Sequence, residues 1–172
     1  MNEDDSRRAM RTRLLRGYGR LGIRILGLSV ILLVLFTQVY PLHRVRGTEM
    51  FPAVKDGDLL LAFRFQHNYR KNDIVLYLFD GERRVGRIVA VESDYVNILE
   101  DGTLIVNGTQ QRGEVLFRTD PRGGEYPIQV PGGYVFLLGD NREEARDSRD
   151  FGSVPLSAVE GKVISLFRRR GF

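Results

Sequence analysis

An apolar run near the N-terminus is the strongest pattern in the chain. Residues 21–40 read LGIRILGLSVILLVLFTQVY and, as a helix, would be about 30 Å long, the thickness of a bilayer core. Arg24 is the only charge in the run, and near a helix end its side chain can reach the lipid headgroups. A cleavable secretory signal and a buried core helix are the alternatives. Since no small-residue cleavage site follows Tyr40 and residues 25–36 have no polar face, we predict a transmembrane anchor.

After Pro41 the pattern changes to short runs of branched and aromatic residues that are typical of β-strands. Turn signals such as Asp80-Gly81 and Asn107-Gly108 separate the runs and suit tight hairpins. We therefore predict a mainly β domain over residues 41–172, with a polar excursion at residues 109–130. The predicted strands cover residues 59–65, 73–79, 85–91, 95–99, 103–106, 134–138 and 162–167.

Charge adds an orientation to this picture. The 172 residues carry a formal net charge of +4, and only three of the 26 basic residues are lysines. Arginines crowd residues 1–20, before the apolar run, which favours a membrane over nucleic acid as the anionic partner. By the positive-inside rule, residues 1–20 are a basic cytoplasmic segment and residues 41–172 are extracytoplasmic. The absence of cysteine excludes disulfides, thiolate metal sites and cysteine nucleophiles.

Three segments of the outer domain resemble, in order, the motifs of type I signal peptidases of the small Gram-positive type. The first is GTEMFP at residues 47–52, the second is GRIVAV at residues 86–91 with the hairpin after it, and the third spans residues 139–155. The third is long and specific, whereas the first two alone would be weak. The resemblance covers residues 45–164. It implies the family's mainly antiparallel β fold after one N-terminal transmembrane helix, an apolar surface near the bilayer, and a cleft that accepts extended peptides.

The same resemblance implies a catalytic serine and a buried, neutral lysine that removes its proton. Glu49 stands at the serine position and Gly86 at the lysine position, while Ala145 replaces a serine that helps to orient the lysine. We therefore predict a catalytically inactive member of the family, a pseudoenzyme with no catalytic residues. Glu49, Gly86 and Ala145 are then former catalytic positions.

Other side chains could still support chemistry near Glu49. Thr48 and Ser148 are hydroxyls in the neighbourhood, although the lysines of the chain fall outside the strand motif. A carboxylate pair between Glu49 and Asp140 or Asp147 is a further alternative. Ordinary ion pairing explains the same acids better, and the expected partners are Arg87, Arg142 and Arg149. His43 and His67 have no ligand spacing, so neither a metal nor a cofactor is predicted.

The motifs also have structural interpretations. Met50, Phe51 and Pro52 are candidates both for hydrophobic packing and for a partner-binding cleft. We predict that the third motif is mainly structural, because its glycines permit tight backbone paths and its charged residues can pair with one another. The residues of this structural motif are Gly139, Asp140, Asn141, Arg142, Asp147, Ser148 and Arg149.

These observations predict a single-pass membrane protein that acts as a non-catalytic chaperone or assembly factor for secreted surface proteins. The resemblance to pilus-assembly signal-peptidase-like proteins implies pilin subunits and a sortase as partners, beside membrane lipid and without nucleic acid. The alternative is a type I signal peptidase that cleaves signal peptides with an unconventional active site. It would need a hydroxyl and a neutral base within hydrogen-bond reach near Glu49. A repressor-type module, which shares the β core, is disfavoured by the membrane span and by the lack of a helix-turn-helix.

Overall fold

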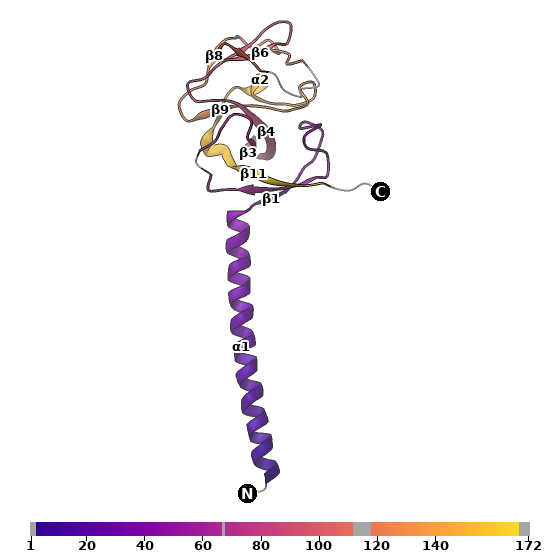
Figure 1. Cartoon of the computed structure of the whole chain (residues 1–172), viewed down its shortest axis with the longest axis vertical. Coiled ribbons are helices and arrows are strands. Elements are labelled where there is room, and N and C mark those ends of the chain that lie inside the picture. Colours follow the sequence, from indigo (N-terminus) through magenta and orange to yellow (C-terminus); the bar gives the residue numbers. More distant parts are fainter. Residues whose placement is uncertain (1–2, 67, 112–117, 169–172) are drawn as a thin grey trace. The chain divides into compact units, whose positions relative to one another are not determined.

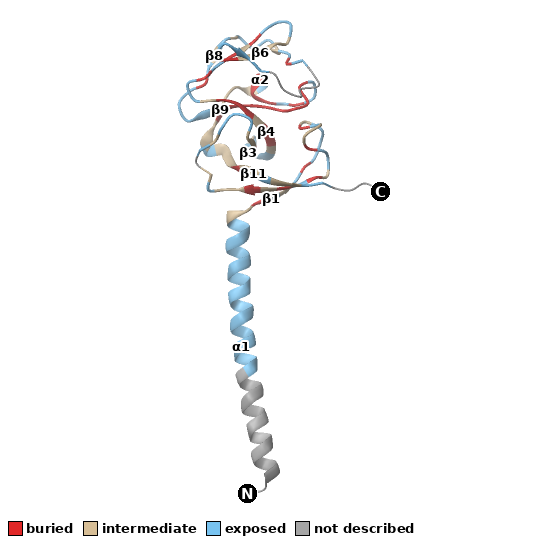
Figure 2. Cartoon of the chain, in the orientation of Figure 1, coloured by how far each residue is buried: buried red, intermediate tan, exposed pale blue. Residues whose placement is uncertain are grey.

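The computed structural model describes residues 3–66, 68–111 and 118–168, with side chains from residue 18 onward. The chain divides into two compact units, residues 1–39 and residues 40–172. The first unit is one helix, α1 (Glu3–Val39). Its segment Tyr18–Val39 is long and apolar enough to cross a membrane, and its side chains are almost all exposed in the structure (Figure 2). The apolar run of the sequence therefore lies in a longer helix that begins further toward the N-terminus, and it is suited to anchor the chain in a membrane.

The second unit consists of two antiparallel β-sheets (Figure 1). A four-residue helix, α2 (Ser148–Phe151), and a single 3-10 turn at Leu156–Ala158 complete it. The prediction of a mainly antiparallel β domain after one N-terminal apolar helix is confirmed. In spatial order, the larger sheet contains β1 (Leu42–Arg44), β2 (Leu59–Phe63), β11 (Val159–Phe167), β3 (Ile74–Phe79), β4 (Glu82–Val91), β9 (Tyr134–Leu138) and β10 (Val154–Pro155). The smaller sheet contains β7 (Thr109–Gln110), β6 (Leu104–Val106), β5 (Tyr95–Ile98) and β8 (Ile128–Gln129).

Alternation of side chains along the strands builds the core. In β2, Leu60 and Ala62 point inward and are fully buried, while Leu59 remains partly exposed. Strand β9, which lies between β4 and β10, is apolar at every position, and four of its five residues are buried. The tight turn between β3 and β4 has positive φ at both Asp80 and Gly81, as a two-residue hairpin requires. This turn fixes the register that places Arg84 opposite Tyr77 and Gly86 opposite Val75.

All seven predicted strands are present, with ends that shift by a few residues. Strand β4 begins earlier than predicted, at Glu82, and β11 begins at Val159. Strands β1, β7, β8 and β10 were not predicted, because two or three residues are too few to show an alternating pattern. The polar excursion at residues 109–130 contains β7 and β8, while its residues 112–117 lie outside the described part of the chain.

The two neighbours of β4, strands β3 and β9, pair with different parts of its length. All of β3 pairs with the first part of β4, from Glu82 to Arg87. On the other side β9 pairs with β4 only from Arg87 to Val91. The loop between β1 and β2 carries Glu49, whose carbonyl oxygen accepts a hydrogen bond from the Asn141 amide at 2.9 Å. The first and third sequence motifs thus meet through the backbone.

Candidate active site

Gly139 holds the first and third motifs in close contact. A Cβ atom at this position would lie 2.2 Å from the Cβ of Ala145 and 2.6 Å from the carbonyl oxygen of Glu49. Real Cβ atoms do not approach other atoms this closely, so only glycine fits. Ala145 is buried, and its amide donates to the Asn141 carbonyl at 2.9 Å. Glu49 and Ala145 therefore flank the same glycine.

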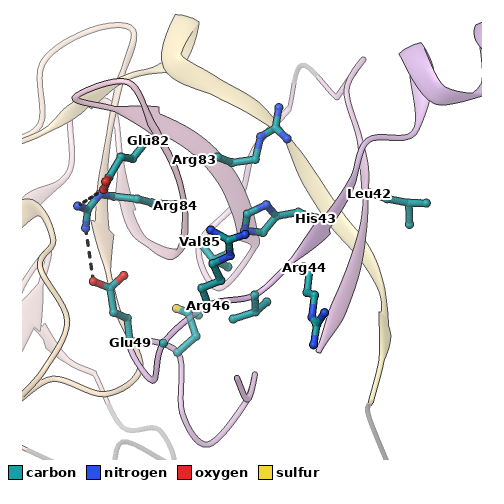
Figure 3. Close-up of a pocket in the computed structure, with 12 residues that line it drawn as sticks. Leu42, His43, Arg44, Arg46, Glu49, Glu82, Arg83, Arg84 and Val85 are labelled. Atoms are coloured by element: carbon teal, nitrogen blue, oxygen red, sulfur yellow. Dashed lines mark hydrogen bonds and ion pairs between the residues drawn. The ribbon is translucent and has the colours of Figure 1, made fainter. Parts of the chain in front are cut away.

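The Glu49 side chain faces strand β4. Its Oε1 lies 3.4 Å from Nη1 of Arg84, and the other terminal nitrogen of Arg84 donates to Glu82 at 3.0 Å (Figure 3). Partial burial raises the pKa of the Glu49 carboxyl, and the nearby Arg84 charge opposes that rise. The site thus contains a half-buried carboxyl group that holds a proton more readily than an exposed glutamate does.

A tyrosine occupies the space beside Gly86. A Cβ atom at Gly86 would lie 3.1 Å from Cε1 of Tyr77 and 3.5 Å from the Cβ of Leu137. Tyr77 is fully buried, and both this burial and the negative charge of Glu49 raise the pKa of its phenol. Tyr77 therefore lies near both Gly86 and Glu49. Tyr77 could not be identified from the sequence, because no motif marks it and its place is set by cross-strand pairing with Arg84.

A pocket of about 640 Å³ opens between β1, the loop after it and the start of β4 (Figure 3). Glu49 and Met50 line it, whereas Gly86, Ala145, Phe51 and Pro52 do not. The complete lining is Leu42, His43, Arg44, Val45, Arg46, Gly47, Glu49, Met50, Glu82, Arg83, Arg84 and Val85.

The three predicted partner-binding residues differ in how far they are buried. Met50 is 2% exposed and packs in a core cluster with Val54 and Leu60, so it is a structural residue that also contributes to the pocket wall. Phe51 is 37% exposed and Pro52 is half-buried. Of the three, Phe51 presents the largest apolar surface to a partner.

The two hydroxyls considered from the sequence differ in their partners. The Thr48 hydroxyl is exposed and donates a hydrogen bond to the Glu144 carboxylate. The Ser148 hydroxyl is buried and accepts a hydrogen bond from the Leu137 amide at 2.9 Å. Thr48 is thus accessible beside a carboxylate, whereas Ser148 supports strand β9.

The buried pair Asp147 and Arg149 organises the third motif. Asp147 binds the Arg149 guanidinium through both carboxylate oxygens, each at 2.9 Å, and accepts a hydrogen bond from the Gly139 amide at 3.0 Å. Asp147 also caps α2, with Asp150 completing a capping box. These contacts tie the helix to the end of β9.

The remaining charges of the motif, Asp140 and Arg142, bind residues outside it. Asp140 binds Arg87 through two hydrogen bonds, at 2.7 and 2.6 Å. Arg142 is buried and donates to the Thr119 hydroxyl at 2.8 Å, and burial lowers its pKa to about 10. Two of the expected ion pairs are therefore present, Asp140 with Arg87 and Asp147 with Arg149. Glu49 pairs instead with Arg84, which was not among the expected partners. In the described part of the chain, Asp140 and Asp147 bind arginines and neither shares a hydrogen bond with Glu49.

His43 forms no metal site with the other residues that the structure describes. His43 lines the pocket, and its pKa is lowered by burial and by Arg83. His67 lies outside the described residues. Within residues 3–66, 68–111 and 118–168, no three histidine, aspartate or glutamate side chains gather as metal ligands would.

Comparison with known proteins places the sequence in a family. A family model described as "Signal peptidase, peptidase S26" matches residues 18–167. The chain belongs to this signal peptidase family. Thylakoidal processing peptidase 1 of Arabidopsis thaliana is 33% identical over 141 residues, which are 72% of this chain but 40% of that longer protein. Signal peptidase I of Bacillus licheniformis is 28% identical over 155 residues, covering 80% of this chain and 82% of that one. The crystal structure of a signal peptidase I from Enterococcus faecalis V583 is 26% identical, with a TM-score of 0.47, over 57% of this chain and 97% of that one.

These relatives contradict the prediction that the chain is not an enzyme. Each is named as a peptidase, and the Bacillus protein matches over most of both chains. The prediction equated the loss of one reacting pair with the loss of hydrolysis. The positions of that pair hold no serine or lysine, but a carboxyl group with a raised pKa, a guanidinium and an accessible hydroxyl lie beside them. The interpretation as a non-catalytic assembly factor is therefore set aside.

Proposed function

We propose that the chain is a membrane-anchored peptidase that cleaves extracytoplasmic signal-peptide segments with an unconventional active site centred on Glu49. The observation that carries the proposal is the place of the Glu49 carboxyl, which stands at the motif position of the family's serine and lines the pocket of about 640 Å³. Membership of the signal peptidase family supports the substrate class.

In the proposed reaction, Glu49 acts as a general base on water. The carboxylate accepts one proton from water while the resulting hydroxide attacks the scissile carbonyl carbon. The protonated carboxyl then donates that proton to the leaving nitrogen, the C–N bond breaks, and a carboxylic acid and an amine are released, while Glu49 returns to its carboxylate form. This route avoids a mixed anhydride between Glu49 and the substrate. The raised pKa of Glu49 helps both steps, because the group accepts and returns the proton closer to neutral pH.

Arg84 supplies the electrostatic part of the proposal. Its guanidinium lies 3.4 Å from Glu49 and is only 13% exposed. A fixed positive charge there stabilises the oxyanion of the tetrahedral intermediate more strongly than water would. Gly86 contributes no base, and the Tyr77 ring fills the space beside it.

The membrane helix gives the proposed peptidase its location. We expect a single pass through residues 21–40, nearly all of which belong to the apolar helix segment Tyr18–Val39. Residues 1–20 would then be cytoplasmic and the domain of residues 41–172 outside, where signal-peptide segments emerge. Membrane lipid and these segments are the expected partners. Pilin subunits and a sortase stay predictions, and pilin or sortase genes beside this gene would support them.

The test uses the full-length chain in detergent and a purified preprotein with its signal peptide. We expect cleavage at one position, read by mass spectrometry, and a loss of about 100-fold or more in rate for Glu49→Gln. Glu100→Gln removes an equally charged but exposed side chain outside the pocket, and it should cleave like the wild type. No cleavage by the wild type, or equal cleavage by Glu49→Gln, would refute the proposal.

Thr48 provides a second possible centre, because its hydroxyl already bonds a carboxylate. The variant Thr48→Val separates the two routes. We expect it to keep cleaving, since Thr48 does not line the pocket. If Thr48→Val abolishes cleavage and Glu49→Gln does not, the nucleophile is the Thr48 hydroxyl with Glu144 as its base.

A further inference from the structure

The pocket beside Glu49 is basic. Four arginines and two glutamates line it. Two of the arginines are already paired: Arg83 with Glu160, including one bond of 2.9 Å, and Arg84 with Glu82 and Glu49. The other two are Arg44 and Arg46, and both are exposed. The lining therefore carries positive charge that its own acids do not balance.

Arg46 is the cation best placed to receive a ligand. In Figure 3 its side chain lies between Glu49 and His43, whereas Arg44 points away from the Glu49–Arg84 pair. Among the described residues, no carboxylate forms an ion pair with Arg46. The pKa of His43 beside it is lowered by burial and by the charges of Arg83 and Arg46, which outweigh the opposing charge of Glu160, so the neutral imidazole is favoured at neutral pH. A ligand at this point meets one arginine charge and a neutral imidazole.

The hydrogen bonds of Arg84 are incomplete. Its Nε atom is buried and has no hydrogen-bond partner among the described residues. Its bond to Glu49 is long, at 3.4 Å, and its other partner, Glu82, has a side chain that is 71% exposed. An incoming carboxylate can replace Glu82 with little loss, since that side chain is largely exposed.

The open edge of β4 indicates what kind of ligand would enter. Residues 82–86 pair with β3 on one side, whereas the pairing with β9 on the other side begins only at Arg87. An extended peptide can add to such an edge through main-chain hydrogen bonds, which would bring its side chains next to Arg84. A phosphate group suits the pocket less well, because Glu49 and Glu82 in the lining would repel its larger negative charge.

We propose that the pocket selects peptide segments with an acidic side chain beside the scissile bond, and that Arg46 and Arg84 are its specificity-determining residues. This inference rests on the proposed peptidase function. A substrate carboxylate can take the place of Glu82 on Arg84, which leaves the other terminal nitrogen of that guanidinium beside Glu49 and the oxyanion. An acidic substrate therefore gains in binding without loss of the charge at the reaction centre.

The test compares matched peptides that span the cleavage site and differ by one residue, aspartate or asparagine, at each position near the scissile bond. With the full-length chain in detergent, we expect about tenfold higher kcat/KM for the aspartate peptide at one or two positions, the contribution of one charge-assisted hydrogen bond. Arg46→Gln should remove most of this preference. Arg70→Gln makes the same charge change at an exposed position outside the pocket and should keep the preference.

Binding measurements separate this inference from the proposed function. The variant Glu49→Gln, which should not cleave, is titrated with the same fluorescent peptides. The inference is supported, even if no variant cleaves, when Glu49→Gln binds the aspartate peptide more tightly than the asparagine peptide and adding Arg46→Gln removes that difference. Equal cleavage of both peptides by the wild type overturns the inference and leaves the peptidase function standing. Equal binding without cleavage overturns both, and an Arg46→Gln effect on phosphatidylglycerol vesicles but not on peptides would assign the pocket to lipid.

Discussion

Gly139 offers a sharp test of how the first and third motifs meet. In Gly139→Ala the added methyl carbon would lie 2.2 Å from the Ala145 Cβ and 2.6 Å from the Glu49 carbonyl oxygen. One of these neighbours is backbone and the other is a buried residue, so neither can move without shifting a loop. Forced overpacking of this kind costs about 3 kcal/mol, which lowers the melting temperature of a chain of this size by roughly 6–12 °C. Because the loop that shifts carries Glu49, cleavage should fall as well.

The assay is thermal unfolding of the full-length chain in detergent, followed by circular dichroism. Gly132→Ala is the matched control, since its Cβ would meet nothing within 4 Å, and it should change the melting temperature by little. Adding Ala145→Gly to Gly139→Ala removes the closer contact and should restore part of the loss. A Gly139→Ala protein as stable as the Gly132→Ala protein would refute this packing of the motifs.

Three further predictions follow from the charges of the two units. Asp147→Ala leaves the fully buried Arg149 guanidinium without its carboxylate and should cost about 3–5 kcal/mol in urea unfolding, whereas an unchanged midpoint would contradict a buried pair. The pKa of Glu49 is higher in the folded chain than in the unfolded chain. Ionised Glu49 therefore lowers the free energy of unfolding at pH values above its folded-state pKa, and this loss disappears below its unfolded-state pKa. Glu49→Gln should therefore raise the melting temperature near neutral pH and leave it unchanged below about pH 4; a gain that persists in acid would be inconsistent with this. Protease added to intact protoplasts should digest residues 41–172, and protection of that domain would reverse the expected topology.

The longer strands could be predicted from the sequence, because their apolar residues alternate or run continuously between glycine turns. Strand β9 was predicted to the residue, and the Asp80-Gly81 turn has the positive φ angles that its sequence favours. The edge strands β1 and β10 have two or three residues, so neighbouring strands rather than a local pattern determine them. The helix α2 has four residues and depends on the capping box of Asp147, which a search for helical periodicity does not detect.

Only part of the site could be predicted from the sequence. The motifs indicated where Glu49 stands, but its partner Arg84 and its neighbour Tyr77 come from the β3–β4 hairpin, through a register that no motif encodes. The prediction of inactivity failed for a different reason. It considered only the residues that replace the serine and lysine, and it gave no weight to the raised pKa that burial confers on Glu49. Burial of a single carboxyl depends on the packed loop around Gly139 and cannot be deduced from the residue type.

The central claim is that Glu49 carries out hydrolysis in the basic pocket, and the pH dependence of signal-peptide cleavage tests it most directly. We predict that kcat/KM rises with pH as Glu49 ionises, with a midpoint above the ordinary glutamate value of 4.5, and that Glu49→Gln loses the activity across the whole range. No cleavage at any pH, or the same pH profile in wild type and Glu49→Gln, would contradict the account.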